Sequence, residues 1–306
     1  MSDFKTSNNK PESGSYASGS PLGKTTEYVD QYSPRLLHAI SRQDYRATIK
    51  NSSALSGERD LDKGSDIWHA YELSHLQPNG LPKAFILRLS IPVNSPNIIE
   101  SKSLKLYLNS FSQTTLASSD ALLDALHKDL TAKIGVLVKC ELYDVGMGET
   151  FADLKLPRLQ GGLDTTTFKR INLDRLNIEC NNYQPDVNLL KLDKAAPIEA
   201  FITSHLLRSN CPITNQPDWA TLSVVYSNTK NNIGLSMESL LKYIVSYRQH
   251  NGFHEQTVEQ IFSDLSGLGL ERLLVCAQYT RRGGVDINPI RTTGDLSFNV
   301  ARVNRQ

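Results

Sequence analysis

Cys211 stands in the segment RSNCPITNQPDW, and Asp218 follows it seven positions later. Free cysteines usually serve as small buried apolar side chains, and Cys140 and Cys276, which lie inside alternating apolar stretches, fit that interpretation. Cys211 lies instead among turn-forming residues, where burial is hard to arrange, so we consider it a candidate nucleophile. A thiol nucleophile needs a nearby base or cation, and Asp218 is better suited to carry a proton. Alternatively, Asp218 simply caps a turn.

Two further segments carry groups that could bind a ligand. In RQHNGFHEQ, His254 and Glu255 stand at the expected start of a helix. A carboxylate such as Glu255 can accept both hydrogen bonds from the donor edge of a guanine-like base, although a glutamate also suits the positive end of a helix dipole. In YTRRGGVD, Arg281 and Arg282 stand before two glycines in an expected turn that could hold a phosphate, or that is simply a solvated turn.

The segment IIESKSLK places Glu100, Ser101 and Lys102 after two isoleucines. Lysines beside an expected strand are also an ordinary protection against edge-to-edge aggregation. No glycine-rich G-x-G-x-x-G follows a strand pattern, so a dinucleotide, if used, would not bind in a Rossmann fold. Spacing alone therefore yields a group of Cys, Asp, His and Glu with possible phosphate ligands, and no named substrate.

Composition excludes several classes of protein. The 306 residues carry a formal charge of +1, which argues against a direct nucleic-acid partner. No apolar run approaches the roughly 20 residues that span a bilayer, and the polar N-terminus lacks a signal-peptide core, so we expect a cytoplasmic protein without a membrane partner. Four widely spaced cysteines without a C-x-x-C pair argue against disulfides and against a structural metal.

The pattern of apolar residues predicts an α+β chain. We expect strands at 83–91 and 103–111 that form a hairpin, a helix at 121–134 and a strand at 136–144. The second half repeats the plan with strands at 198–207 and 219–227, helices at 237–245 and 258–265, and a strand at 271–280. Residues 66–74 are expected to pack against the sheet. The boundaries are a disordered leader at 1–22, a first module at 23–165, a connector at 166–190 and a catalytic module at 191–306.

The segments ESKSLK, SNCPITNQPDWA, SLLKYIVSYRQHNGFHE and RGGVDINP occur together and in this order. In this the chain resembles the long, two-module nitrile reductases that convert 7-cyano-7-deazaguanine to 7-aminomethyl-7-deazaguanine with NADPH, on the way to the tRNA base queuosine. The resemblance implies two tandem tunnelling-fold modules, each an antiparallel sheet backed by helices, and a homodimer. Two departures are visible: Thr257 stands where relatives often have cysteine, and Arg281 where proline is common.

The resemblance also implies roles for single residues. Cys211 would attack the nitrile carbon and form a covalent thioimide, and Asp218 would act as the acid. The residues implied to bind the deazaguanine substrate are Ile99, Glu100, Ser101, His254 and Glu255. The residues implied to bind NADPH are Ser101, Lys102, Arg282 and Gly283. No metal is implied.

Two other functions remain open at this stage. A thiol hydrolase that uses Cys211 and His254 would turn over esters or amides without a nicotinamide. A non-catalytic purine-binding module would retain Glu100 and Glu255, and Cys211 or Asp218 would be dispensable.

Overall fold

The computed structural model describes residues 25–26, 28–49, 63–145, 159–160, 168–293, 297–298 and 303–306. Its centre is a mixed sheet of eight strands in the order β5-β3-β2-β13-β12-β10-β9-β7. Their bounds are β2 Gly64–Leu76, β3 Pro82–Pro92, β5 Lys139–Asp144, β7 Lys169–Asn172, β9 Glu199–Asn210, β10 Pro217–Ser227, β12 Arg272–Tyr279 and β13 Val285–Thr292. Neighbours are antiparallel except for the edge pair β7 and β9.

The remaining elements are short strands and helices. Three two-stranded sheets pair β1 with β4, β8 with β11 and β6 with β14. Their bounds are β1 Ala39–Ser41, β4 Asn97–Ile99, β6 Leu159–Gln160, β8 Leu192–Asp193, β11 Gly234–Leu235 and β14 Ser297–Phe298. The helices are α1 Arg42–Arg46, α2 Ser101–Asn109, α3 Ser119–Ile134, α4 Met237–Ser246 and α5 His254–Ser266, with 3-10 turns η2 Pro34–Leu36, η6 Leu173–Arg175, η7 Val187–Leu189 and η8 Tyr247–Gln249.

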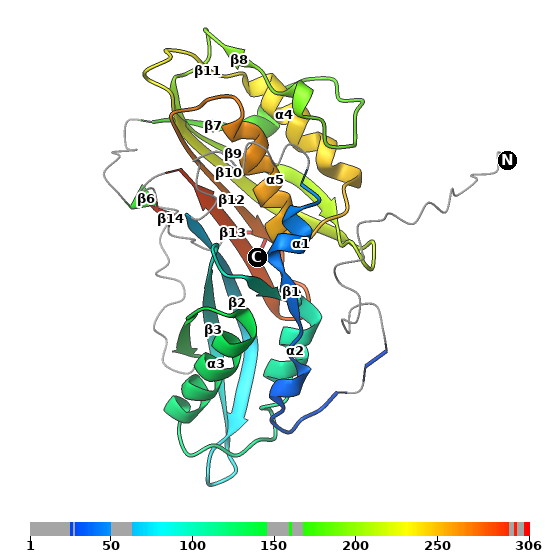
Figure 1. Ribbon diagram of the computed structural model, residues 1–306, viewed down its shortest axis with the longest axis vertical. Helices are drawn as coiled ribbons and strands as arrows, with labels where there is room; N and C mark the ends of the chain where they lie inside the picture. The colour runs from blue at the N-terminus through cyan, green and yellow to red at the C-terminus, as the bar shows by residue number, and fades with distance from the viewer. Residues whose placement is uncertain are drawn as a thin grey trace, which may run out of the picture.

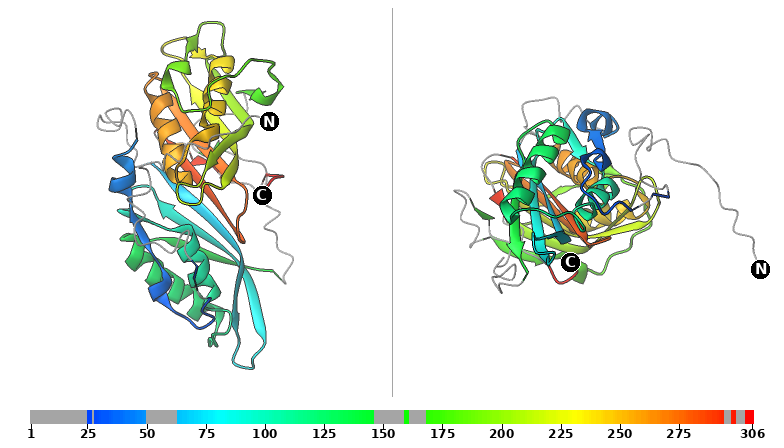
Figure 2. Two further views of the ribbon diagram at one scale, coloured as in Figure 1. Left: turned by 90° about the vertical axis from the view of Figure 1, so that its right-hand side faces the viewer. Right: turned by 90° about the horizontal axis from the view of Figure 1, so that it is seen from below.

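Helices cover one face of the sheet, as Figures 1 and 2 show: α2 and α3 over one half, and α4 and α5 over the other. Each half has its own apolar core. In the first, residues such as Leu87 and Leu89 of β3 pack with Leu126 and Leu130 of α3. In the second, alternate residues of β10 and β12 pack against α4 and α5. The predicted α+β class is confirmed, as are the strand near 83–91, the helix near 121–134 and the strands and helices expected from 198 to 280.

The prediction of a strand at 103–111 was wrong, because Ser101–Asn109 forms the helix α2. Leu104, Leu106 and Leu108 alternate as in a strand, but Leu104, Tyr107, Leu108 and Phe111 also follow the three- and four-residue spacing of a helix, and all four are buried. A pattern this short fits both periods, and the N-cap at Glu100 decides for the helix.

The true hairpin partner of β3 is β2, which includes residues 66–74. Those residues were expected to pack against the sheet, whereas they form one of its central strands. Polar residues such as Asp66 and His69 interrupt the apolar pattern of β2, and both are buried by contacts with distant parts of the chain. Because polar side chains of β2 occupy buried positions, the strand lacks the alternation of apolar and polar residues by which the sequence analysis identified strands.

The two halves of the chain meet where β2 pairs with β13, from Val285 opposite Ala70 to Arg291 opposite Gly64. This pairing makes one continuous sheet out of two hairpin-and-helix units. It also brings the start of α2 from the first half opposite the start of α5 from the second.

A segment near the N-terminus crosses this junction on the helical face (Figure 1). We call residues 34–49 the strap. Its strand β1 pairs with β4, and Ile40 and Tyr45 pack with Ile98 in a small cluster that also contacts Phe253. The strap therefore connects the first half to the beginning of α5.

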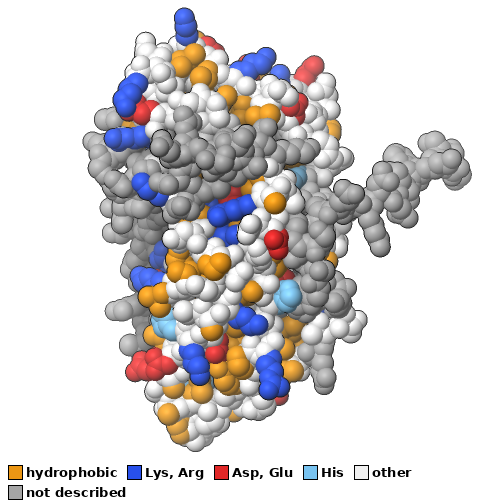
Figure 3. All heavy atoms as spheres, viewed as in Figure 1, with side chains coloured by type: hydrophobic (Ala, Val, Ile, Leu, Met, Phe, Trp, Pro, Cys, Tyr) orange, Lys and Arg blue, Asp and Glu red, His pale blue; other side chains and the backbone are white. Residues whose placement is uncertain are grey.

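None of the helices in the described ranges is long and apolar enough to cross a membrane. On the helical face, the lysine and arginine side chains that Figure 3 colours blue are scattered among other residue types and form no continuous band in the coloured part of the surface.

Gly64 should be critical for the junction. It has φ +133°, and a Cβ there would lie 2.2 Å from the carbonyl oxygen of Ile290 on β13. We expect Gly64→Ala to lower the free energy of unfolding by about 1 kcal/mol for backbone strain plus about 1–3 kcal/mol for the steric overlap. Urea unfolding followed by circular dichroism measures the loss.

Gly80→Ala is the matched control, because Gly80 has φ +82° and no atom within 4 Å of an added Cβ. It should lose only the strain contribution of about 1 kcal/mol. Equal losses for the two variants would contradict a close approach of β2 and β13 at Gly64.

Candidate active site

A cavity of about 310 Å³ lies between the two halves, on the helical side of the junction. Its size is typical of small-molecule sites. The side chains that line it include nearly all the residues singled out in the sequence: Ile99, Glu100, Ser101, Lys102, Cys211, Asp218, His254, Glu255 and Arg282. Gly283 is not among the lining residues. It lies next to the cavity, because a Cβ added to it would be 3.3 Å from the side chain of Lys105, which does line the cavity.

Cys211 is held in the tight loop between β9 and β10. Its backbone N–H donates to the carbonyl of Gln216 at 2.8 Å, and its carbonyl accepts from Asn215, which has φ +55°. The expectation that this thiol is hard to bury was wrong, because Cys211 is only 6% exposed. Ile213 of the same loop packs against Ile40 and Ile98 of the first half, and Cys211 lines the cavity between the halves.

The segment just before α5 holds this loop in place. Asn210 N–H donates to the carbonyl of His250 at 2.8 Å, and Gly252 N–H donates to the carbonyl of Asn210 at 3.1 Å. Asn251 continues the link, since its side chain donates to Asn215 Oδ1 at 3.0 Å. The nucleophile candidate and the first turn of α5 are therefore positioned as one unit.

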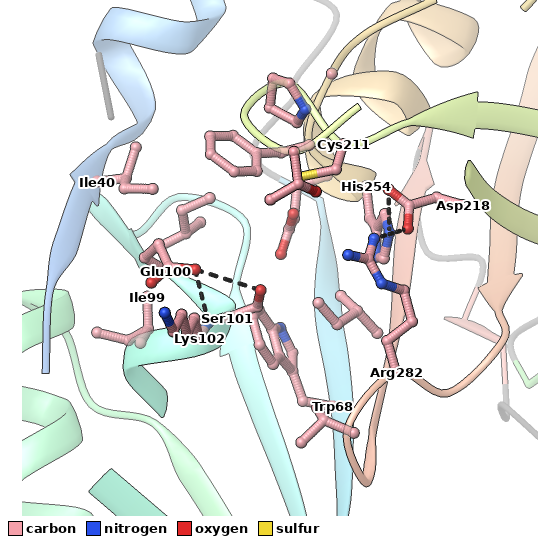
Figure 4. Close-up of a pocket in the computed structure, with 18 of the residues that line it drawn as sticks. Ile40, Trp68, Ile99, Glu100, Ser101, Lys102, Cys211, Asp218, His254 and Arg282 are labelled. Atoms are coloured by element: carbon pink, nitrogen blue, oxygen red, sulfur yellow. Dashed lines mark hydrogen bonds and ion pairs between the residues drawn. The ribbon is translucent and has the colours of Figure 1, made fainter. Parts of the chain in front are cut away.

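Asp218 is buried between two positively charged or chargeable groups on the second half (Figure 4). His254 Nε2 lies 3.4 Å from Asp218 Oδ2, and Arg282 Nη1 donates to Oδ1. Burial alone would raise the pKa of Asp218, but the charges and hydrogen bonds of His254 and Arg282 outweigh it and hold that pKa below its ordinary value. Asp218 is thus an anion while Arg282 contacts it.

His254 has its ring stacked on Tyr279, with centroids 3.7 Å apart and planes 6° apart. This stacking fixes the imidazole beside Asp218. Arg282 is also fixed by a hydrogen bond of 2.6 Å from Nη2 to Gln216 Oε1. The aspartate, histidine and arginine form one hydrogen-bonded group at the edge of the cavity.

Glu100 approaches the cavity from the first half, as the N-cap of α2. Its Oε1 accepts from Lys102 N–H at 2.6 Å and its Oε2 accepts from Ser103 N–H at 2.9 Å. Figure 4 shows Glu100 across the cavity from Asp218. Because the cap fixes the orientation of the carboxylate, its remaining lone pairs are directed in advance toward a ligand.

Glu255 lies in the first turn of α5 and is 2% exposed. Its Oε1 is buried and makes no hydrogen bond with any described residue. Burial, with a smaller contribution from the charge of Asp66, raises the pKa of Glu255 to about 8. A buried acceptor without a partner, on the wall of a cavity, is a ready site for hydrogen-bond donors of a ligand.

Sequence reasoning missed several residues of the cavity. Lys105 falls in the segment 103–111 that was expected to be a strand, but in α2 it lies one helical turn after Lys102 and lines the cavity. Burial and the charge of Arg282 lower the pKa of Lys105. Once residues 101–109 are recognised as a helix, the three-residue spacing of Lys102 and Lys105 places both lysines on the same face. Ile40 and Trp68 also line the cavity, and no local pattern identifies them.

Within the described part of the chain, no cluster of three or more His, Cys, Asp or Glu is placed to hold a metal ion.

Comparison with known proteins is decisive for the family. Residues 28–142 match the family model described as "Nitrile reductase, 7-cyano-7-deazaguanine-reductase N-term", and residues 217–297 match the model "QueF-like protein". A protein of Paraburkholderia xenovorans named NADPH-dependent 7-cyano-7-deazaguanine reductase is 43% identical over 90% of this chain and 94% of its own length. Proteins with the same name from Burkholderia lata and Ralstonia nicotianae are each 44% identical, over 89% and 91% of this chain and 93% and 94% of their own lengths.

The chain belongs to the 7-cyano-7-deazaguanine reductase family. The resemblance seen in the sequence motifs is thereby confirmed, and with it the assignment to a family of NADPH-dependent oxidoreductases. Among solved structures, the apo archaeosine synthase QueF-Like aligns with 33% of this chain and 99% of its own, at 20% identity and a TM-score of 0.30.

In this member of the reductase family, Glu255 should make stability fall as pH rises. Its pKa is near 8 in the folded protein and near 4.5 when unfolded. The stabilisation of the fold by protonated Glu255 is therefore fully present below pH about 4.5 and is lost between pH about 4.5 and 8. Glu255→Gln should remove this loss and unfold with a free energy higher than the parent's by roughly a few kcal/mol at pH 8. Urea unfolding between pH 5 and 8.5 measures it.

Glu238→Gln is the control, because Glu238 also stands in the first turn of a helix but is exposed. It should leave the pH dependence unchanged. A Glu255→Gln curve parallel to the parent's would show that Glu255 ionises normally in the fold.

The reductase should also respond to loss of the Arg282 contact with Asp218. We expect Arg282→Gln to raise the pKa of Asp218 by about one unit, a value reduced by the 34% exposure of the Arg282 side chain. Carbon-13 NMR of aspartate-labelled protein, assigned with Asp218→Asn, follows the titration. Arg281→Gln is the control, because Arg281 stacks on Tyr71 at 4.5 Å and makes no ion pair with Asp218. Equal titration in all three proteins would refute the assigned role of Arg282.

Proposed function

We propose that this protein reduces the nitrile of 7-cyano-7-deazaguanine to the aminomethyl group of 7-aminomethyl-7-deazaguanine, with NADPH as the source of hydride. The observation that carries the proposal is the convergence of Cys211, Asp218, Glu100 and Glu255 in one cavity of a chain that belongs to this reductase family. Relatives 43–44% identical over about nine-tenths of the chain, named for this reaction, support the same conclusion.

The cavity suits a flat, guanine-like base. Glu100 and Glu255 come from α2 and α5, on the two sides of the junction. A carboxylate accepts hydrogen bonds from neighbouring N–H groups, so Glu255, with its open Oε1, would accept from the donor edge of the base. Apolar side chains of Ile40, Ile99 and Trp68 would cover the faces of the ring. Ser101 and His254 complete the residues that we assign to the substrate.

The first chemical step is the addition of Cys211 to the nitrile. A nitrile is a poor hydride acceptor, and attack by sulfur converts the C≡N bond into the C=N bond of a thioimide. The new S–C bond forms at the nitrile carbon, and the nitrogen gains one proton. We assign this transfer to Asp218, which takes the S–H proton of Cys211 and passes it to the nitrogen, with His254 at 3.4 Å as its neighbour. Asp218 is protonated only when Arg282 no longer neutralises it.

The overall reduction needs two hydrides and two protons for each nitrile. NADPH, when bound, supplies the two hydrides in succession. The thioimide carbon accepts the first, Cys211 then leaves as a thiolate, and the resulting imine accepts the second. Because free imines hydrolyse in water, the site must limit the access of solvent while the imine exists, and the bound base and NADPH would fill the cavity between the two halves.

The residues around the cavity fit a dinucleotide phosphate. Lys102 and Lys105 lie at the start of α2, and Arg282 lies on the turn from β12 to β13, where Gly283 has φ +56°. Lys105 lines the cavity within electrostatic range of Arg282, so the two cations could act on one bound anion. We assign the cofactor contacts to Ser101, Lys102, Arg282 and Gly283.

The geometry favours a reductase over a cysteine hydrolase. A hydrolase would pair Cys211 with a histidine as general base. Among the described residues, His254 contacts Asp218 and Tyr279 and makes no hydrogen bond to Cys211. A non-catalytic purine-binding module is also less favoured, because Cys211 and Asp218 both face the cavity.

We infer a wider setting from the same family. The sheet and its two helical cores are consistent with two tunnelling-fold modules at 23–165 and 191–306, joined by a connector at 166–190. The leader predicted at 1–22 lies outside the described residues. A homodimer, a cytoplasmic location and a place in the synthesis of the tRNA base queuosine belong to this proposal, with no direct nucleic-acid partner.

Mixing the protein with 7-cyano-7-deazaguanine and NADPH tests the function. NADPH absorbance should fall by two equivalents for each nitrile, and without NADPH the intact mass should increase by the mass of the whole nitrile. Cys211→Ala should abolish the mass increase and slow NADPH oxidation by at least about 10³-fold, because the covalent step is lost.

Cys180→Ala serves as the control, since Cys180 lies outside the cavity. It should keep both the adduct and the rate. Full oxidation of NADPH by Cys211→Ala would refute the thioimide, and no oxidation by the parent would refute the function.

A further inference from the structure

Five charged side chains form a buried cluster behind Glu255, and none of them lines the cavity. They come from the strap, β2, α5 and β13. Asp66 accepts from Arg42 at 2.6 Å and from Arg291 at 2.7 Å, and Glu259 accepts from Arg291 at 2.8 Å and from Arg46 at 2.9 Å. Four of the five are at most 1% exposed, and Arg46 is 22% exposed. We call these residues the ionic cluster.

The ionic cluster is not electrically balanced. Three guanidinium groups face two carboxylates, which leaves one positive charge in the interior. The charges of the arginines, with Arg291 the largest contributor, outweigh burial and hold the pKa values of Asp66 and Glu259 below their ordinary range, so both are anions. Tyr45 donates to Glu259 at 3.1 Å and accepts from Arg42 at 2.7 Å, and it adds no charge. A buried net charge is costly unless a counter-charge lies nearby.

Glu255 is the nearest candidate for that counter-charge. It precedes Glu259 by four residues on α5, so the two side chains lie on the same face of the helix, one turn apart. Glu255 faces the cavity, and Glu259 contacts the arginines. The charge of Asp66 opposes ionisation of Glu255, while those of Arg42 and Arg291 favour it. The ionic cluster therefore contains a charge that raises the pKa of Glu255 and charges that lower it.

Other titratable groups also face Glu255. Tyr279 of β12 lies within electrostatic range of it, and His254 is its neighbour on α5. Across the cavity are Glu100 of α2 and, from the β9–β10 loop and β10, Cys211 and Asp218. All of these belong to the site itself, whereas the ionic cluster lies outside it.

We propose that the ionic cluster sets the charge of Glu255 and thereby the strength with which the cavity holds the N–H donor edge of a guanine-like base. Its members are positioning residues, because they act through Glu255 and touch no ligand. In the free protein at neutral pH, Glu255 carries a proton; on binding, the donor edge displaces that proton and the positive charge of the cluster compensates the new carboxylate. The inference rests on the proposed function, since it takes the ligand to be 7-cyano-7-deazaguanine.

The strap gains a role from this arrangement. Arg42 and Arg46 both belong to it, so two of the three positive charges come from a segment that precedes the central sheet in the chain. Ile40 of the same segment lines the cavity. The strap therefore walls the cavity through Ile40 and supplies positive charge behind Glu255 through Arg42 and Arg46.

Calorimetric titration of the Cys211→Ala protein with 7-cyano-7-deazaguanine, in buffers of different ionisation enthalpy, counts the protons released on binding without the covalent step. We expect release of nearly one proton per ligand at pH 7, falling to none above pH about 9, with Glu255→Gln releasing none. The pH midpoint of this release reports the ionisation of Glu255.

Removing a negative and a positive charge from the ionic cluster in separate variants tests its effect on Glu255. Asp66→Asn removes a negative charge and should move the midpoint down by about one unit, whereas Arg42→Gln removes a positive charge and should move it up by about one unit. The double variant restores the net charge, and its midpoint should return close to that of the parent. A structural role alone would not give shifts of opposite sign that cancel.

Two further variants keep the test decisive. If either single variant fails to fold by circular dichroism, Arg46→Gln, at the partly exposed member, should still raise the midpoint. Arg88→Gln is the matched control, because Arg88 is a part-buried arginine paired with Glu141 on the sheet and should change nothing.

The possible failures are distinguishable. If the parent does not bind 7-cyano-7-deazaguanine or oxidise NADPH with it, the proposed function fails. If it does both but the midpoints of the charge variants stay fixed or move in the same direction, the proposed function stands and the role of the ionic cluster is overturned.

Discussion

The pairing of β2 with β13 is the contact on which the site depends. Each half of the chain buries its own apolar core, and neither half alone contains a complete cavity. Backbone hydrogen bonds from Val285 opposite Ala70 to Arg291 opposite Gly64 join the halves into one sheet. They place the cap of α2, with Glu100, across from the loop of Cys211 and the first turn of α5. A small change of register there would shift these groups relative to one another by the length of a residue.

Burial raises the pKa of both carboxyl groups on the second half, but only at Asp218 do neighbouring charges outweigh it. Asp218 and Glu255 are both almost fully buried. Asp218 has an arginine and a histidine within contact distance and stays ionised, whereas Glu255 forms no ion pair with the described residues and has a pKa of about 8. The same cavity thus holds one carboxyl group that tends to be charged and one that tends to be neutral. Sites that move protons commonly separate pKa values in this way.

Several elements were predictable from the sequence because their pattern is long and has one period. The helix at 119–134 spaces its leucines four apart over four turns, and β10 and β12 show extended apolar runs. The short segment 101–109 fits two periods, and its helical state is decided by the capping of α2 and by burial against β2. The strand β2 escaped prediction because its polar residues find buried partners from residues more than 200 positions away, such as Asp66 with Arg291.

The sequence by itself determined the family and the identity of the reactive groups, since a thiol, a carboxylate or a guanidinium has its chemistry wherever it stands, and the motifs preserve their order. Only the tertiary structure decided which of these groups meet, how deeply they are buried and what faces them. It showed a buried Cys211, an Asp218 held between His254 and Arg282, and a Glu255 backed by charges from its own helix and three distant segments. The physical reason is that desolvation and charge interaction depend on distance in space, and local sequence carries no record of contacts made across two hundred residues.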